Sequence, residues 1–409
     1  MTYLREALPR VQVDIIDEQV LGRRRFIDAL SRSGYDIAGF SPISLTYGRN
    51  LECARILKKN GAIVVMGGHY APALSKEILA NRGPGSGDYC VDAIVRYDGE
   101  HALRELAKGT PFSGINNLVY RREDGSIAEN PVEMLKFSDL PPVDYTLVNL
   151  EEYFRRQPPD LRILPFISQR GCQWAEKSGR CLFCSIPARS FTAMDPSAVG
   201  RQTSFLAEKL GVRHLFEAST DFASSAEWLS ALAAGSAGLK KLSWRIFARA
   251  ESLTRANIRY LKAVNVGHVC IGTESFSDEI LRRMGKGSNC RVNKTAISLL
   301  VEAGIVPRIS LTLGSLGESR ESLKQTFVEL KKLDLTAEGW EIMLVNPLTP
   351  RPGTVAWSRL LAKERKYRGQ DIFNTKELRF DWLKHFCEVD YPRLAAARNE
   401  INNLIASRI

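Results

Sequence analysis

The chain has 409 residues, of which 44% are hydrophobic and 25% charged, and its formal net charge is +11. These values are typical of a globular protein with two domains or one large domain and an extension. The sequence contains no run of about eighteen apolar residues, so we expect no membrane span. The basic residues are scattered, with only GRRRF and KERKYR as short runs, and aromatic residues do not alternate with them. We therefore expect a dispersed basic surface, with no membrane contact and no nucleic-acid partner.

The N-terminal segment MTYLREALPRVQVDIIDE lacks the charged and then apolar regions of a secretory signal. We therefore expect a cytoplasmic protein in a reducing compartment. In such a compartment the eight cysteines are free or metal-bound rather than paired in disulfides.

The first part of the chain alternates β-rich and helical segments. Helices are predicted at 49–61 and 101–109, and strands at 11–17, 35–44, 62–70 and 91–100. This alternation predicts βαβ units and hence a parallel, Rossmann-like sheet over residues 1–115. Residues 116–160 read as a hairpin that turns at Asp124-Gly125, followed by a proline-rich linker.

From residue 161 to 358 the alternation resumes and gives six strand–helix units. The expected strands are 163–169, 212–219, 242–249, 268–274, 306–314 and 339–347. Six such units predict an α/β fold with a partial (β/α)6 barrel, and the chemistry of such barrels gathers at the carboxyl ends of the strands. Residues 359–409 are predicted to form a helical C-terminal extension that caps the barrel.

Three cysteines, Cys172, Cys181 and Cys184, follow the first barrel strand in a C-x8-C-x2-C pattern. Three thiolates can hold three irons of a cubane cluster and leave the fourth iron open to a small molecule. Structural zinc would need a fourth ligand, which this loop lacks, yet zinc and inert core cysteines stay open as alternatives. The five other cysteines have no partner at ligand spacing: Cys53, Cys90, Cys270, Cys290 and Cys387.

Several segments together resemble the radical S-adenosylmethionine enzymes that carry a cobalamin-binding-type domain before the barrel. They are CLFC with Phe183, CIGTESFSDEILRRMGKG, AISLLVEAGIVPRISLTLGSLGESRESLKQT, NPLTPRPGT, YDIAGFSPISLTYG and IVVMGGHYAPAL. The resemblance covers nearly the whole chain. One departure is the first gap of the cysteine loop, which has eight residues where the family usually has three.

The resemblance implies a [4Fe–4S] cluster on Cys172, Cys181 and Cys184, with S-adenosylmethionine on its open iron. An electron donor of the flavodoxin, ferredoxin or reductase type would reduce the cluster, and the resulting radical would take hydrogen from a small-molecule substrate. Cofactor contacts carry over to Phe183, Arg249, Glu274, Ser310 and Asn346. Catalytic proton transfer is expected from Glu217 and Asp221.

Cobalamin is possible but not favoured. Residues 1–10 read as the first helix of a cobalamin-type domain and residues 11–17 as its second strand, so its first strand is missing, and no D-x-H-x-x-G motif is present. We therefore expect a vestigial domain and, by analogy with aminoglycoside 1,2-diol dehydratases, the dehydration of a sugar or aminoglycoside diol in secondary-metabolite biosynthesis. The alternatives are a cobalamin-dependent radical methyltransferase and a tRNA-modifying radical enzyme.

Overall fold

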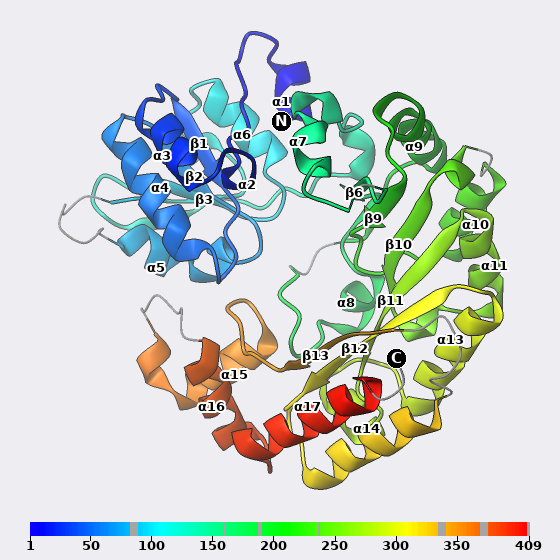
Figure 1. Cartoon of the computed structure of the whole chain (residues 1–409). Coiled ribbons are helices and arrows are strands. Elements are labelled where there is room, and N and C mark those ends of the chain that lie inside the picture. The colour runs from blue at the N-terminus through cyan, green and yellow to red at the C-terminus, as the bar shows by residue number, and fades with distance from the viewer. Residues whose placement is uncertain are drawn as a thin grey trace. The chain divides into compact units, whose positions relative to one another are not determined.

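The computed structural model describes residues 1–81, 89–158, 160–186, 190–235, 238–333, 341–368 and 375–406. The chain divides into two compact units (Figure 1). The N-terminal unit comprises Met1–Tyr153, Ser185–Pro187 and Arg351–Asn374, and the half-barrel unit comprises Phe154–Cys184, Ala188–Pro350 and Thr375–Ile409. Among the described residues, no helix combines the length and the hydropathy needed to cross a membrane.

The N-terminal unit is built on a five-stranded sheet whose strands lie side by side in chain order. The strands are β1 (Ile37–Phe40), β2 (Ile63–Met66), β3 (Ala93–Val95), β4 (Leu118–Arg121) and β5 (Ile127–Glu129). The first three are parallel, and β4 and β5 add an antiparallel hairpin to β3. The predicted parallel sheet and the hairpin are both confirmed.

The helices of this unit follow the predicted alternation. They are α1 (Thr2–Ala7), α2 (Glu18–Leu21), α3 (Arg23–Ser31), α4 (Tyr47–Lys59), α5 (Ser75–Ala80), α6 (Glu100–Ala107) and α15 (Val355–Lys363), and α7 (Leu150–Phe154) lies at the boundary with the next unit. Asp92 joins one helix to the sheet, because its carboxylate accepts Lys58 Nζ at 2.9 Å and Val64 N at 2.7 Å. This ion pair fixes the C-terminal end of α4 beside β2.

The strand predicted at residues 11–17 is wrong. That segment has no strand structure, and the side chain of Ile15 within it is 49% exposed. A strand is stable only where a neighbour satisfies its backbone N–H and C=O groups. Within the described sheet β1 pairs with β2 alone. Residues 11–17 have an alternating apolar pattern but do not pair with a strand of this sheet.

The half-barrel unit contains six parallel strands, again side by side in chain order. They are β6 (Ile163–Phe166), β9 (His214–Glu217), β10 (Ser243–Ala248), β11 (Val266–Glu274), β12 (Val306–Leu313) and β13 (Glu341–Pro347). All neighbouring pairs are parallel. The predicted partial (β/α)6 barrel is therefore confirmed, and all six strands direct their carboxyl ends to one edge.

Helices follow each of the first five strands and cover the sheet. They are α9 (Pro196–Leu210), α10 (Ala226–Ala234), α11 (Arg255–Ala263), α12 (Asp278–Arg283), α13 (Cys290–Glu302) and α14 (Arg320–Lys332). Figure 1 shows α9, α10, α11 and α13 along one side of the sheet, and the short α8 (Gln173–Ser178) on the other. The sheet core is aromatic: Trp244 and Phe222 are fully buried, with ring centroids 6.0 Å apart.

The C-terminal residues form two helices, α16 (Thr375–Phe386) and α17 (Tyr391–Ala406), as predicted. They pack at the carboxyl end of β12, where Trp382 Nε1 donates to the carbonyl of Gly314 at 2.8 Å and Gly317 N donates to Phe386 O at 2.7 Å. Gly314 has φ +73°, and an added Cβ would lie 3.0 Å from Leu383. The glycine therefore permits the close approach of α16.

The turn after β12 also contains a buried carboxyl group, Glu318, which is 1% exposed. It accepts hydrogen bonds from Gly314 N at 3.1 Å and from the hydroxyl of Ser322. Burial raises the pKa of Glu318 to about 7 in spite of these bonds. The folded protein therefore holds a proton there that the unfolded chain has already released above its ordinary pKa near 4.5.

This carboxyl group gives a pH-dependent stability. A pKa raised on folding means that the stabilisation is fully present below about pH 4.5 and is lost as the pH rises through about 7. Relative to Glu318→Gln, which resembles the protonated form, the wild-type free energy of unfolding should fall across this window by up to about 3 kcal/mol. Urea denaturation of both proteins at several pH values between 4.5 and 8 measures the difference, and parallel pH profiles would contradict it.

Candidate active site

The cysteine loop leaves and rejoins the half-barrel at one place. Its ends, β7 (Gln169–Arg170) and β8 (Thr192–Ala193), pair as a short antiparallel ladder. Gly171, which precedes the first cysteine, has φ +85°, and an added Cβ would lie 2.7 Å from the carbonyl of Ser190. Only glycine fits there, so the local sequence fixes where the loop begins.

The three predicted ligands lie on this loop, with Cys181 8% exposed and Cys172 and Cys184 partly exposed. All eight cysteines are free of disulfides. In the parts of the chain that the structure describes, no three Cys, His, Asp or Glu side chains are gathered closely enough to hold a metal ion. The donor set itself suits an iron–sulfur cluster, because three thiolates on one loop are soft ligands and leave one position open.

The loop is held against the turn at 284–287 that follows α12. Leu182 N donates to the carbonyl of Met284 at 2.8 Å, and the thiol of Cys181 lies 3.7 Å from the carbonyl of Gly285. No local pattern predicts that these two segments, which lie about a hundred residues apart along the chain, contact each other. Their contact brings the middle of the cysteine loop to the carboxyl edge of the sheet.

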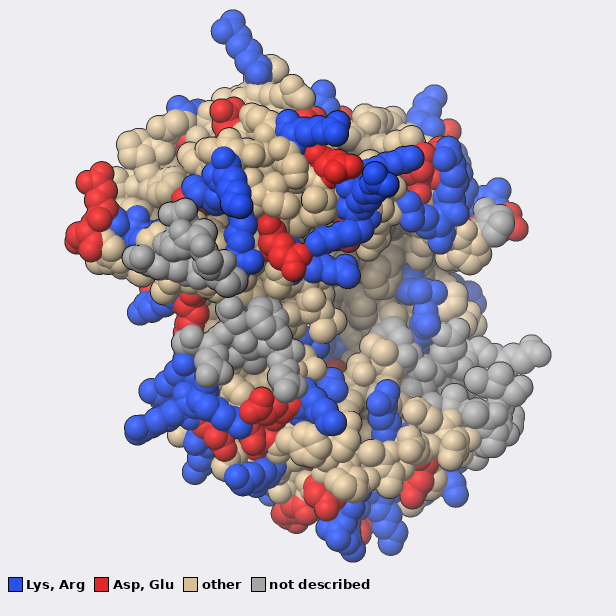
Figure 2. All heavy atoms as spheres, turned by 60° about the vertical axis from the view of Figure 1, so that its left-hand side comes forward, with Lys and Arg blue, Asp and Glu red and all other residues tan. Residues whose placement is uncertain are grey.

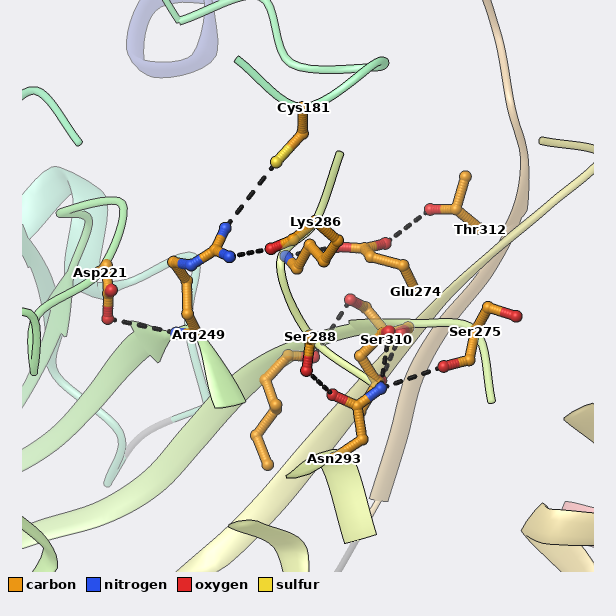
Figure 3. Close-up of polar contacts among 12 residues, drawn as sticks. Cys181, Asp221, Arg249, Glu274, Ser275, Lys286, Ser288, Asn293, Ser310 and Thr312 are labelled. Carbon is orange, nitrogen blue, oxygen red and sulfur yellow. Dashed lines mark hydrogen bonds and ion pairs between the residues drawn. The ribbon is translucent and has the colours of Figure 1, made fainter. Parts of the chain in front are cut away.

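Arg249 follows β10 and lies beside the loop, 7% exposed (Figure 3). Its guanidinium donates to the sulfur of Cys181 at 3.8 Å, to Glu251 at 2.9 Å and to the carbonyl of Lys286. A guanidinium with several donors in one plane can exchange such partners for a carboxylate. Arg249 therefore lies where the cysteine loop meets the turn at 284–287, and its role at the methionyl carboxylate stays a prediction.

Asp221 supports the backbone of Arg249. One carboxylate oxygen accepts Arg249 N at 3.2 Å, and the other accepts the hydroxyl of Ser252 at 2.7 Å. Burial raises the pKa of Asp221, although these hydrogen bonds and the nearby Arg249 charge oppose the shift. Asp221 therefore holds the main chain of Arg249.

Glu217, the last residue of β9, is fully buried. Its carboxylate accepts four hydrogen bonds, from the backbone and hydroxyl of Ser168 at 2.6 and 2.8 Å and from the backbone and hydroxyl of Ser219 at 2.8 and 2.7 Å. Burial raises the pKa of Glu217 in spite of these donors. The carboxylate thus joins the end of β6 to the segment after β9.

Glu274 ends β11 in a left-handed backbone conformation, with φ +61°. The register with β12 shifts between Gly272 and Glu274, and such a bulge turns a side chain to a new direction. The carboxylate accepts Thr312 Oγ1 at 2.7 Å and Lys286 Nζ at 3.4 Å. An added Cβ on Gly272 would lie 2.7 Å from Lys286 Nζ, so this glycine makes room for the ion pair.

Two buried side chains that the sequence analysis missed hold this arrangement. Lys286 is 6% exposed, and Asn293 is fully buried on α13. The amide of Asn293 donates to the carbonyls of Thr273 and Ser275, at 3.1 and 3.0 Å, on either side of Glu274 (Figure 3). The glycines on both sides of Lys286 were the available sequence signal, whereas Asn293 looks like any polar residue of a helix.

The remaining predicted residues differ in position. Phe183 lies on the cysteine loop, with its ring centroid 6.0 Å from Lys286 Nζ. The hydroxyl of Ser310, on β12, donates to the carbonyl of Ile271 at 3.2 Å. Asn346, on β13, is exposed and lies opposite Thr312 in the strand register. The structure therefore gathers Cys181, Arg249 and Glu274 through Lys286, while Ser310 and Asn346 lie along the neighbouring strands.

If cobalamin binds to this chain, its expected place is the carboxyl edge of the N-terminal sheet. Ligands of open parallel sheets bind where the strand order reverses, and the described strands β1 to β3 run in one order without a reversal. The turns at this edge are closely packed: an added Cβ on Gly68 would lie 2.4 Å from Ser41 Oγ, and one on Gly353 would lie 3.2 Å from Ala73. Arg351 also donates to Ser44 there. This strand order and this close packing are the features of the N-terminal unit that bear on cobalamin binding.

The sequence of the half-barrel is similar to those of known proteins. The model of the Radical SAM superfamily matches residues 166–330. An uncharacterized methyltransferase of Pyrococcus horikoshii, PH0819, is 25% identical over 383 residues, which cover 88% of this chain and 76% of that protein.

Two solved structures have a similar fold. The cobalamin-dependent radical enzyme OxsB, solved with aqua-cobalamin and S-adenosylmethionine, matches with a TM-score of 0.67 at 22% identity over 89% of this chain. The chain spans about half (52%) of the OxsB chain. The methyltransferase TsrM of Kitasatospora setae, solved with cobalamin and a [4Fe–4S] cluster, matches with a TM-score of 0.72 at 16% identity over 88% of this chain and 74% of TsrM.

The superfamily implies a [4Fe–4S] cluster and S-adenosylmethionine as cofactors, in agreement with the three thiols of the loop. Because the matched residues run from the end of β6 through the cysteine loop, Arg249 and Glu274 into α14, residues 166–330 form a radical SAM domain.

Proposed function

We propose that the half-barrel unit cleaves S-adenosylmethionine reductively and uses the product to take a hydrogen atom from a small polar substrate. The observation that carries this proposal is the convergence of the cysteine loop, Arg249 and Glu274 through the single residue Lys286. When bound there, the reduced cluster and S-adenosylmethionine supply a 5′-deoxyadenosyl radical. The radical chemistry is that of the cofactor, and the chain supplies position and the exclusion of water.

The chain's own residues have separate roles in this proposal. Arg249 binds the methionyl carboxylate through two parallel hydrogen bonds, exchanging its present partners for the ligand. Glu274 accepts the ribose hydroxyls, and Lys286 and Thr312 keep its carboxylate oriented. Phe183 lies on the same loop as the cluster ligands and packs beside the adenine.

Dehydration of a 1,2-diol is the outcome that we infer if cobalamin does not take part. Loss of a hydroxyl group as water requires a proton donor, and burial raises the pKa of both Glu217 and Asp221, which favours their protonated forms. Asp221 is the better candidate, because Glu217 is enclosed by four hydrogen bonds from Ser168 and Ser219.

Cobalamin-dependent methyl transfer is the second candidate. The similarity to PH0819, named a methyltransferase, and the fold shared with OxsB and TsrM favour it. The one-directional order of β1 to β3 favours the first candidate. A tRNA substrate has less support, because Figure 2 shows Lys and Arg side chains spread over the face in view with Asp and Glu among them. An electron donor of the flavodoxin, ferredoxin or reductase type remains part of the proposal.

Removal of any one loop thiol should abolish S-adenosylmethionine cleavage. Cys172→Ala, Cys181→Ala and Cys184→Ala each leave two ligands, which are too few to retain the cluster with one open iron. After anaerobic reconstitution, iron content should fall to background and 5′-deoxyadenosine should not form. Iron analysis and chromatography of adenosyl products measure both quantities.

The matched control is Cys290→Ser, which changes a partly exposed cysteine of the same unit outside the loop. It should keep about four irons per chain, as a [4Fe–4S] cluster requires. Full iron content and turnover in Cys172→Ala would show that the first ligand is assigned wrongly.

Cobalamin should not be retained. Purified protein incubated with hydroxocobalamin and then desalted should show no corrin absorbance, because the described strands lack the reversal point at which such ligands bind. In parallel, reconstituted protein with and without cobalamin should form the same adenosyl product. Stoichiometric retention of the corrin, or a methylated product that depends on it, would establish the methyltransferase instead.

A further inference from the structure

The long first gap of the cysteine loop folds as a helix. Between Cys172 and Cys181 lie eight residues, and six of them form α8 (Gln173–Ser178), with Cys172 as its N-cap. Gly179, with φ +84°, ends the helix and returns the chain toward Cys181. The second residue of this helix is Trp174, so the long gap between Cys172 and Cys181 places one indole ring at the edge of the site.

Trp174 fits closely against the turn at 284–287. Its Nε1 donates to the carbonyl of Gly285 at 3.0 Å. An added Cβ on Gly287 would lie only 2.1 Å from the indole ring, and Gly285 and Gly287 have φ +67° and +74°. Two glycines thus shape the turn and leave the space that the ring occupies.

The other contact of the indole ring is with Arg249. The guanidinium carbon lies 4.7 Å from the ring centroid, within the range of a cation–π interaction. The guanidinium also donates to the carbonyl of Lys286, on the same turn. Arg249 is therefore held by an aromatic ring and a carbonyl, and both belong to the contact between the cysteine loop and the 284–287 turn.

We propose that Trp174 is a positioning residue, which orients the guanidinium of Arg249 toward the carboxylate of S-adenosylmethionine. This inference rests on the proposed function, since it assigns that ligand to Arg249. An arginine side chain has several rotatable bonds, and stacking limits the orientations that it samples before the ligand binds. The effect of Trp174 should therefore depend on the ligand carboxylate, whereas a role in packing alone would not.

Two substitutions separate these roles. Trp174→Phe and Trp174→Leu both remove the indole N–H and both leave an apolar side chain on α8, but only phenylalanine keeps an aromatic face. The probes are S-adenosylmethionine and its decarboxylated form, which lacks only the carboxylate. Their dissociation constants are measured by equilibrium dialysis on anaerobically reconstituted protein, with iron content determined for each sample.

The wild type should prefer S-adenosylmethionine over the decarboxylated form. Trp174→Phe should keep this preference within about twofold, and Trp174→Leu should reduce it by about 3- to 30-fold, the range expected when a cation–π contact is lost. Affinity for the decarboxylated form should be the same in both variants. Trp228→Leu is the matched control, because the Trp228 indole likewise donates to a backbone carbonyl, of Met194 at 2.7 Å, and it should leave the preference unchanged.

The outcomes distinguish the inference from the function on which it rests. If the wild type has no preference for the carboxylate, or if Arg249→Lys does not weaken it, the proposed role of Arg249 fails. If Arg249→Lys weakens the preference while Trp174→Phe and Trp174→Leu behave alike, the positioning role of Trp174 is overturned. An equal loss of affinity for both ligands, or a loss of iron in both variants, would assign Trp174 to loop packing and likewise overturn the inference.

Discussion

The rest of the candidate site depends on the hydrogen bonds and the ion pair that the guanidinium of Arg249 makes. It contacts Cys181 on the cysteine loop, Glu251 two residues further along the chain and the carbonyl of Lys286 on the turn after α12. Asp221 holds the backbone of the same residue. A positive charge that is 7% exposed is stable only with such partners. The dependence is mutual: these groups stabilise the buried charge of Arg249, and Arg249 in turn joins the segments that carry them.

The strained turn at Glu274 is a second constraint, and it too is supported by distant residues. A non-glycine residue at φ +61° costs on the order of 1–3 kcal/mol. The carbonyls on both sides of it accept hydrogen bonds from Asn293, and its carboxylate is held by Thr312 and Lys286. Strain that is held in this way fixes the direction of the carboxylate before any ligand binds. Lys286 belongs to both constraints, since its carbonyl binds Arg249 and its ammonium group binds Glu274.

Much of the fold was predictable from the sequence, because apolar alternation with glycine and proline at the turns identifies βαβ units. All six barrel strands and the hairpin at Asp124-Gly125 were found in this way. The strand predicted at 11–17 was wrong, because an alternating apolar pattern does not tell whether a partner strand is present. Among the candidate site residues, Cys181, Arg249 and Glu274 were predicted from motifs and from their positions at strand ends. Lys286, Asn293 and Trp174 act through contacts with segments far along the chain, which a local pattern does not contain.

The two units bear differently on the choice between the two reactions. In the half-barrel, the groups that would bind S-adenosylmethionine are those that either reaction needs, so this unit does not discriminate between them. The discriminating feature is the N-terminal sheet, where β1 borders only β2 among the described strands and the turn at Gly68 packs directly on Ser41. A methyl carrier must lie within reach of both donor and acceptor, and that requires a groove at this edge. The folds shared with OxsB and TsrM do not decide the question for this chain, because similar folds can carry different ligand sites.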